Sequence, residues 1–218
     1  MFNFAGAFKF SMDKYNDKQI EIIQVAEKLF ALDGFDGTSV RVIASQANVN
    51  VAMISYYFGS KERLLESIVL FRINGLRLQL ENLVSEDLSP IEKMDKIIEY
   101  YIQQVLSNMS IHQIIQNEFT NKKRDFNLHA FTEVKKSNLA LIKHIITEGQ
   151  LQGVFKESVN AELITPMIIG PIIYFKLNKL FYKDLLTISS DADYDFYIKS
   201  EFTIHLQKTI KALLLHEN

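Results

Sequence analysis

The stretch that most limits what this chain can fold into is TSVRVIASQANVNVAMISYYFGSK, from Thr38 to Lys61. Apolar residues at the i, i+3, i+4 and i+7 positions predict a short helix with one buried face: Val40, Ile43, Ala44 and Ala47. Asn48 ends that helix, and Asn50 can cap a second helix that runs to about Tyr57. Val49 is then the buried turn residue and Ile54 the inward one. Two short helices joined by so tight a turn form a helix-turn-helix.

A preceding helix is predicted to pack against this unit. It begins at a cap on Asn16 or Asp17 and runs to about Leu32. Its apolar face comprises Ile22, Ile23, Ala26, Leu29 and Phe30. Gly34 is expected to end the helix in a left-handed conformation, and Phe35 to fold back onto the apolar face.

Two further caps define the elements around the turn. Thr38 is the expected N-cap of the first short helix, with Ser39 as the alternative. Ser60 caps a longer helix that begins at Lys61 and continues to about Val84. That helix is long enough to link two domains.

The remainder of the chain also predicts helices. Ser89-Pro90-Ile91-Glu92 combines an N-cap, a proline at the first helical position and a capping-box glutamate. Helices are expected at about 91–105, 111–119, 126–150, 161–182 and 194–215, with a charged loop at 121–125 and an extended connector from 154. With only 3 prolines and 8 glycines in 218 residues and no strand-like alternation, we predict an all-α protein. We expect two domains: residues 12–70, which contain the helix-turn-helix, and the helical residues 71–218.

Composition excludes several classes of protein. The absence of cysteine rules out disulfides and thiolate metal sites and fits a reducing compartment, so we expect a cytoplasmic protein. No apolar run approaches the ~20 residues of a membrane span, and the Phe-rich start at 1–11 lacks the unbroken apolar run of a signal peptide. The five histidines form no metal-ligating spacing, and no nucleophile motif or phosphate loop is present. We therefore expect no cofactor, no metal and no catalytic residues.

The second short helix has the surface that the DNA major groove requires. One α-helix fits that groove, provided that its exposed side carries small or polar groups. Such residues are Asn50, Val51, Ala52 and Ser55. Asparagine can pair bidentately with adenine, and valine or alanine can contact a thymine methyl group.

Donors for DNA phosphates are expected around this helix. Thr38 and Ser39 lie at a helix N-terminus, where backbone N–H groups favour an anion. Further donors are the hydroxyls of Tyr56 and Tyr57 and the cations of Arg41 and Lys61. A helix-turn-helix is nevertheless common in α-proteins, and the net charge of −2 gives no general sign of a nucleic-acid partner. A protein-binding adaptor, or an all-α enzyme without paired acid–base groups, stays open on the spacing alone.

The segment IIQVAEKLFALDGFDGTSVRVIASQANVNVAMISYYFGSKERLL, residues 22–65, resembles the N-terminal domain of the tetracycline-repressor (TetR) family. The AExLFxxxGF, TSVRxIA and ISYYFGSKExLL blocks follow one another without gaps. The resemblance implies that Thr38 and Lys61 clamp phosphates, that residues 50–55 read bases, and that Tyr56 and Tyr57 contact the DNA backbone. It implies a dimeric regulator, by family habit a repressor, that binds an operator in double-stranded DNA. Val51 departs from the basic or polar residue that is frequent at this position of the family.

The second domain is expected to bind a small-molecule effector and a second copy of the chain. By resemblance, its last two helices form a four-helix dimer interface; an ordinary intramolecular core is the alternative. Asn138 is a polar break in the apolar face of the long helix, and Pro171 is expected to kink the helix that contains it. We hypothesise that Asn138 faces an effector cavity lined by Tyr101, Phe131 and Met167; the alternative is a buried or edge asparagine whose hydrogen bonds are satisfied within the protein.

Overall fold

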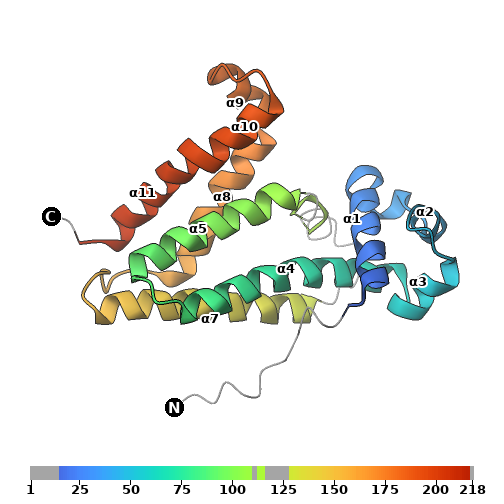
Figure 1. Cartoon of the computed structure of the whole chain (residues 1–218), viewed down its shortest axis with the longest axis horizontal. Helices are drawn as coiled ribbons and strands as arrows, with labels where there is room; N and C mark the ends of the chain where they lie inside the picture. Colours follow the sequence, from blue (N-terminus) through green and yellow to red (C-terminus); the bar gives the residue numbers. More distant parts are fainter. Residues whose placement is uncertain (1–14, 110–111, 116–127, 217–218) are drawn as a thin grey trace, which may run out of the picture. The chain divides into compact units, whose positions relative to one another are not determined.

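The computed structural model describes residues 15–109, 112–115 and 128–216 of the chain, and within them every regular element is helical (Figure 1). The described residues divide into two compact units. The first comprises the residues up to Gly75 together with the described residues between 112 and Val134, and the second comprises 76–109 and 135–216. Helix α4 (Lys61–Ser85) contributes residues to both units. The functional boundary after residue 70 stays a prediction.

The first unit contains α1 (Asp17–Gly37), α2 (Val40–Gln46), α3 (Val51–Phe58) and the first part of α4. The predicted apolar faces meet in one core, whose fully buried members include Ile22, Ile23, Ala26, Ile43, Ala47, Ile54, Leu64 and Ile68. The backbone of Gly34 leaves the helical region with φ of 73°, which confirms the expected end of the regular helix at that glycine. Phe35 then packs on Phe30 with the ring centres 5.1 Å apart.

Local capping chemistry explains why these helices begin where they do. The side chain of Asn16 accepts a hydrogen bond from the Gln19 amide, and the Gln19 side chain accepts one from the Asn16 amide, which completes a capping box. Ser60 likewise accepts from the amide of Arg63 at the start of α4. Asn48 adopts a left-handed φ of 49° in the turn between α2 and α3, a conformation that asparagine tolerates well.

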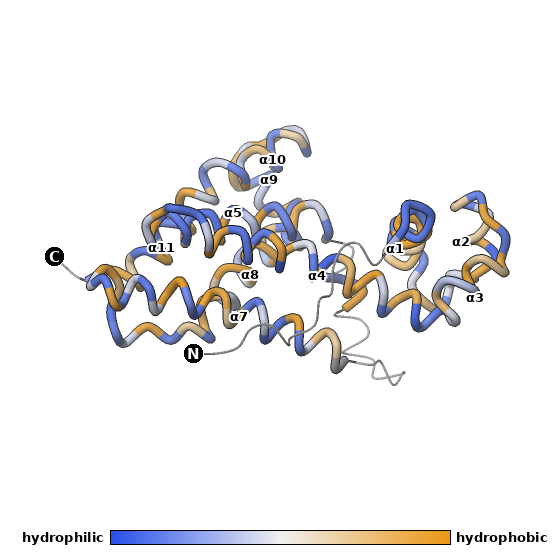
Figure 2. The backbone as a smooth tube through the Cα atoms, turned by 60° about the horizontal axis from the view of Figure 1, so that its bottom comes forward, coloured by the Kyte–Doolittle hydropathy of each residue, from blue (hydrophilic) through white to orange (hydrophobic). Residues whose placement is uncertain are grey.

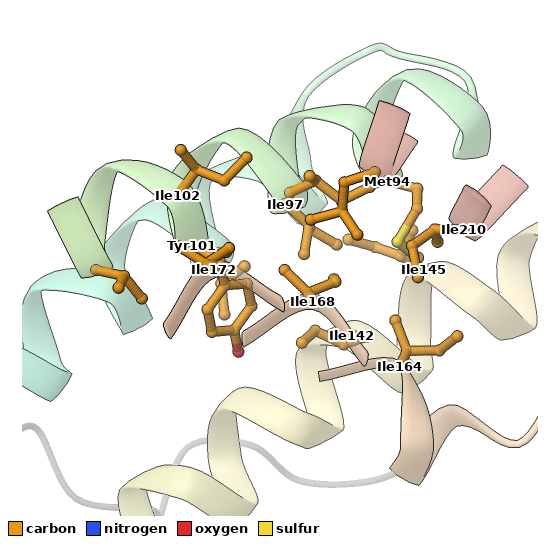
Figure 3. Packing of buried hydrophobic residues seen from close by; sticks show 14 of the residues in the cluster. Met94, Ile97, Tyr101, Ile102, Ile142, Ile145, Ile164, Ile168, Ile172 and Ile210 are labelled. Carbon is orange, nitrogen blue, oxygen red and sulfur yellow. The ribbon is translucent and has the colours of Figure 1, made fainter. Parts of the chain in front are cut away.

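The second unit contains the rest of α4, α5 (Pro90–Ser107), most of α7 (Leu128–Leu151), α8 (Ala161–Leu177), α9 (Lys179–Leu185), α10 (Asp191–Tyr197), a π-helical turn (Ile198–Phe202) and α11 (Thr203–Leu214). Helix α5 packs against both α8 and α11. Along α7, apolar and polar residues alternate at helical period (Figure 2). The core side chains of α5, α7, α8 and α11 are almost entirely isoleucine, leucine, methionine and valine (Figure 3).

The structure corrects two predicted helices near the C-terminus. The predicted helix 161–182 ends at Leu177, and α8 and α9 are bent by 80° relative to each other. Asn178 accounts for the break because its side-chain amide donates to the carbonyl oxygen of Tyr174 (2.9 Å) and competes with the helical ladder. The predicted helix 194–215 contains a π-helical turn, where the Thr203 hydroxyl donates to the carbonyl oxygen of Ile198 (2.7 Å).

Two other expectations can be compared only in part. Of the predicted helix 111–119, the described residues 112–115 are helical, and the charged loop at 121–125 lies outside the described residues, as do residues 1–11. The expected connector after α7 is extended: Phe155 pairs with Leu215 in an isolated β-bridge, and the Lys156 amide donates to the carbonyl oxygen of Leu214 (2.8 Å).

Candidate nucleic-acid interface and regulatory core

Helix α3 turns one face into the first unit and the other to solvent. Ile54 and Phe58 are 1% and 6% exposed, so they anchor the helix. The outward face consists of Val51, Ala52, Ser55 and Tyr56. Only Tyr56 is large, and this residue is 84% exposed. Its ring meets the ring of Tyr57 edge-on, with the ring centres 5.3 Å apart. A face this narrow and small, with one aromatic hydroxyl at its end, fits the dimensions of the major groove.

Asn50 acts first as a helix cap. Its Oδ1 accepts a hydrogen bond from the Met53 amide at 2.8 Å. The bidentate pairing with adenine that the residue type permits would therefore have to share this oxygen with the cap. The Nδ2 group, by contrast, has no such role at the cap and is the part of Asn50 best placed to donate to a base.

Lys61 joins α4 to the end of α1. Its ammonium group donates to the carbonyl oxygens of Phe35 and Thr38, both at 2.8 Å, and lies 4.2 Å from the centre of the Phe35 ring. An ammonium group has three donors, so one remains for a phosphate. The unfavourable position of a cation at the start of α4 is compensated by these two carbonyl contacts. The predicted phosphate contact of Lys61 stays a prediction.

Thr38 is not the N-cap of α2; that position belongs to Ser39, whose side chain accepts from the Val42 amide (3.2 Å). The Thr38 hydroxyl instead donates to the carbonyl oxygens of Gly34 (2.8 Å) and Leu29 (3.2 Å), and the residue is 2% exposed. A phosphate would have to displace one of these contacts to reach the Thr38 hydroxyl. Ser39 and Arg41, in contrast, are both exposed.

A buried ion pair inside the first unit was not foreseen from the sequence. Glu27 on α1 is 3% exposed, and its carboxylate accepts from the guanidinium of Arg72 on α4 at 2.7 and 2.9 Å. The signal that could have revealed it is a charged residue directly beside Ala26 on the apolar face of the first helix. The pair ties α4 to the DNA-binding helices.

Of the four residues proposed to line an effector cavity, three are buried and Met167 is exposed. Tyr101 is buried in the core of the second unit, whereas Phe131 belongs to the core of the first unit. Met167 is 41% exposed on α8. Asn138 is buried, as the hypothesis requires, and its Oδ1 has no hydrogen-bond partner. That these four residues line one effector cavity stays a prediction.

A groove of about 530 Å³ lies elsewhere in the second unit, between α5 and the segment from α10 to α11. It is lined by Glu99, Ile102, Gln103, Leu106, Ser107, Asp195, Lys199 and Thr203. None of the predicted ligand-binding residues lines it. The groove combines carboxylates, a lysine and an amide with the apolar side chains of Ile102 and Leu106, so its lining is mixed, unlike the neighbouring core.

The last helices pack into the core of the second unit. From α10 to α11, apolar residues spaced four apart form a ridge that is buried in the core of its own chain: Tyr194, Ile198, Phe202, Leu206, Ile210 and Leu214. Helix α8, which carries no charged residue between Glu162 and Lys176, buries Ile164, Ile168 and Ile172 and leaves Leu163, Met167, Tyr174 and Leu177 exposed. The dimer interface of the last two helices stays a prediction, and an apolar surface remains on the outer side of α8.

Comparison with known proteins decides the family. Residues 22–68 match the family described as "Bacterial regulatory proteins, tetR family", and residues 72–178 match the "YsiA-like protein, C-terminal region". The chain belongs to the TetR family of bacterial regulatory proteins. As a TetR-family protein it is a ligand-responsive, DNA-binding transcriptional regulator, in a family of regulators and not of enzymes. The adaptor and enzyme alternatives are thereby set aside.

Curated relatives of this TetR-family regulator cover both of its domains. It is 26% identical over 161 residues to the fatty acid metabolism regulator protein of Bacillus subtilis, an alignment that spans 74% of this chain and 82% of the relative. It is 27% identical over 168 residues to the transcriptional repressor NicS of Pseudomonas putida, across 72% of this chain and 75% of that repressor.

Solved structures agree on the fold. The regulator FadR of Bacillus subtilis in complex with stearoyl-CoA superposes with a TM-score of 0.70 at 20% identity, over 90% of this chain and 99% of that one. FadR of Bacillus halodurans superposes with a TM-score of 0.70 at 19% identity, over 88% and 97%. In the described part of this TetR-family chain, no single helix is long and apolar enough to cross a membrane; α8 and α9 reach that hydropathy only as a bent pair.

Proposed function

We propose that this TetR-family regulator is a homodimeric cytoplasmic repressor that leaves its operator when a long-chain acyl thioester binds its C-terminal unit. One observation carries the proposal: the YsiA-like region at 72–178 lies in a chain that aligns along most of its length with a fatty acid metabolism regulator. A solved relative of the same fold contains stearoyl-CoA.

The interior of the second unit suits an alkyl chain. The side chains that face one another there include Ile97, Ile142, Ile164, Ile168 and Ile172 (Figure 3). Each methylene buried among them contributes about 0.8 kcal/mol. That gain offsets the work of separating packed helices to admit the chain. The ligand and the operator then favour different arrangements of the helices. The ligand therefore weakens operator binding, and the operator weakens ligand binding by the same factor.

Helix α4 is the natural carrier of that coupling. It contributes to both units, and within the first unit the Glu27–Arg72 ion pair attaches it to α1. A shift of α4 in response to the effector would therefore move the helix-turn-helix. In a dimer, two α3 helices would enter successive major grooves at a spacing of about 34–36 Å or a multiple of it.

The outer side of α8 supports the dimer. Leu163, Met167, Tyr174 and Leu177 are between 41% and 62% exposed, and Pro166, Gly170 and Pro171 lie exposed among them. On α11, Ile204 and Leu213 are each 45% exposed. An apolar surface of this kind marks an interaction site in a folded protein.

The effector proposal is tested with the purified regulator and an operator obtained by genomic selection. The fluorescence anisotropy of the labelled operator is followed while octadecanoyl-CoA, coenzyme A or octadecanoate is added. We expect release by octadecanoyl-CoA alone. Equal release by coenzyme A, or retention of the operator in all three titrations, would contradict the proposed effector class.

The dimer is tested by replacing Met167 with glutamate and measuring sedimentation equilibrium. The charge would lie in the proposed apolar interface, so we expect the dimer to dissociate at concentrations at which the wild type stays dimeric. The matched control is Leu151→Glu, because Leu151 is 85% exposed at the end of α7. Identical association of the two variants would argue against an interface on α8.

A further inference from the structure

Asn138 is a polar group placed where the fold calls for an apolar one. It is 5% exposed, and its neighbours one turn away on the same face of α7, Val134 and Ile142, are 5% and 0% exposed. The Asn138 Oδ1 atom is buried and has no hydrogen-bond partner. Buried polar groups in folded proteins are nearly always paired, and an unpaired one lowers stability. A ligand that pairs with Asn138 would explain why the amide stands there.

The register of α5 and α7 places Asn138 close to the level of Tyr101. The two helices are linked near one end by the ion pair of Lys93 and Glu148, at 3.0 Å. The two helices run in opposite directions. Tyr101 lies eight residues, or about 12 Å, after Lys93 on α5. The same distance on α7 leads from Glu148 back to about residue 140. That level lies between Asn138 and Ile142.

A second polar group lies in the same region of the core. The Tyr101 ring leaves α5 and directs its hydroxyl oxygen toward α7 and α8, beside Ile142 (Figure 3). The Tyr101 hydroxyl shares a hydrogen bond with the Thr165 side chain of α8, and burial raises the pKa of Tyr101, which therefore stays neutral. In the structure the Tyr101 hydroxyl is thus paired, whereas the Asn138 Oδ1 atom is not.

We infer that Asn138 is the polar contact of the effector site and that it selects an acyl chain that carries a hydroxyl group. The inference rests on the proposed function. A side-chain amide both donates and accepts, and a hydroxyl group does the same, so the two are complementary. A plain alkyl chain passing Asn138 would leave the amide unpaired and would bind less well.

The test compares three thioesters in the operator-release assay: octadecanoyl-CoA, 3-hydroxyoctadecanoyl-CoA and 12-hydroxyoctadecanoyl-CoA. One neutral hydrogen bond corresponds to a preference of about fivefold to tenfold. We expect one hydroxylated probe to release the operator at a concentration lower by that factor. In Asn138→Leu the advantage should disappear while release by octadecanoyl-CoA is kept. Asn138→Ala serves as the second variant should leucine overpack the site.

Thermal unfolding without any ligand gives an independent readout. If Asn138 is kept for a ligand, Asn138→Leu should raise the Tm, because an unpaired amide is replaced by an apolar group of similar size. A lower Tm for both variants would show that Asn138 supports the fold and would overturn the inference.

The failure of this inference differs from the failure of the proposed function. Equal potency of the three thioesters in the wild type, or an advantage that survives Asn138→Leu, overturns the role of Asn138 and leaves the acyl effector in place. Retention of the operator with all three thioesters overturns the effector class and this inference together.

Discussion

Replacing Lys61 with methionine would separate two roles of one ammonium group. In the structure this group donates to the carbonyl oxygens of Phe35 and Thr38 at 2.8 Å. Methionine keeps most of the aliphatic chain and removes the donors. Because Lys61 is only half-buried, water can replace part of what is lost, and we expect unfolding by urea to show a loss of about 1–2 kcal/mol.

The effect on DNA binding is larger if the third donor meets a phosphate. Each phosphate contact contributes about 0.9 to the slope of log affinity against log salt concentration. A dimer would lose two contacts, so the slope should become less steep by about 1.8. Between 50 and 200 mM salt, the ratio of wild-type to variant affinity should then fall by about tenfold. Fluorescence anisotropy with a labelled operator measures both slopes.

Lys28→Met is the matched control, because Lys28 is exposed on α1 and the net charge changes equally. The control should leave the salt slope within about 0.3 of the wild type, as expected for a charge that meets no phosphate. An unchanged slope in Lys61→Met, together with the expected loss of stability, would refute the phosphate contact and leave Lys61 a purely internal link.

Three further exchanges test other parts of the structure. In Gly149→Ala the new Cβ would lie 2.2 Å from the ring of Phe155, which is 1% exposed, so thermal unfolding should show a loss of about 3 kcal/mol. Glu27→Gln should lower the free energy of unfolding in urea by about 2 kcal/mol. This loss is smaller than for breaking a fully buried ion pair, because the arginine partner retains contact with water. Burial raises the pKa of Tyr194 to about 12, while its hydroxyl donates to the carbonyl oxygen of Phe175. Since the unfolded chain loses this proton near pH 10, the contribution is complete below pH 10 and is lost toward pH 12; circular dichroism should show a weaker alkaline decline in Tyr194→Phe.

Each of these exchanges has a distinct contradicting result. For Gly149, the control is Gly75→Ala: an added Cβ at Gly75 meets no atom within 4 Å, so that exchange should raise stability by about 0.5–1 kcal/mol. Similar changes in both variants would contradict the close packing at Gly149. Unaltered unfolding of Glu27→Gln would show that the ion pair contributes nothing net, and superimposable alkaline profiles would exclude Tyr194.

Features that depend on a few neighbouring residues could be predicted from the sequence. The caps at Asn16, Asn50, Ser60 and Ser89 were predicted because a capping side chain bonds to an amide three residues away. The apolar face of α1 and the exposed face of α3 followed from helical period in the same way. Ile54 was expected to point inward and is 1% exposed.

Features that depend on distant partners could not be predicted in this way. Thr38 had the right residue type for an N-cap, but its hydroxyl is taken by carbonyl oxygens of the preceding helix. Phe131 lies on the same face of α7 as Asn138, yet it packs into the other unit's core. The spacing along one helix says nothing about which neighbour each part of that helix meets.

The sequence by itself determined the helix-turn-helix, the order of the helices and the family, because these depend on local period, caps and contiguous motifs. Only the tertiary structure decided that the ammonium of Lys61 binds two carbonyl groups, that the ridge of the last helix is buried in its own chain, and that the Oδ1 atom of Asn138 is buried without a hydrogen-bond partner. The physical reason is the same in each case. Whether a donor is used or a surface is covered depends on groups that are far apart in the chain and meet only when it folds.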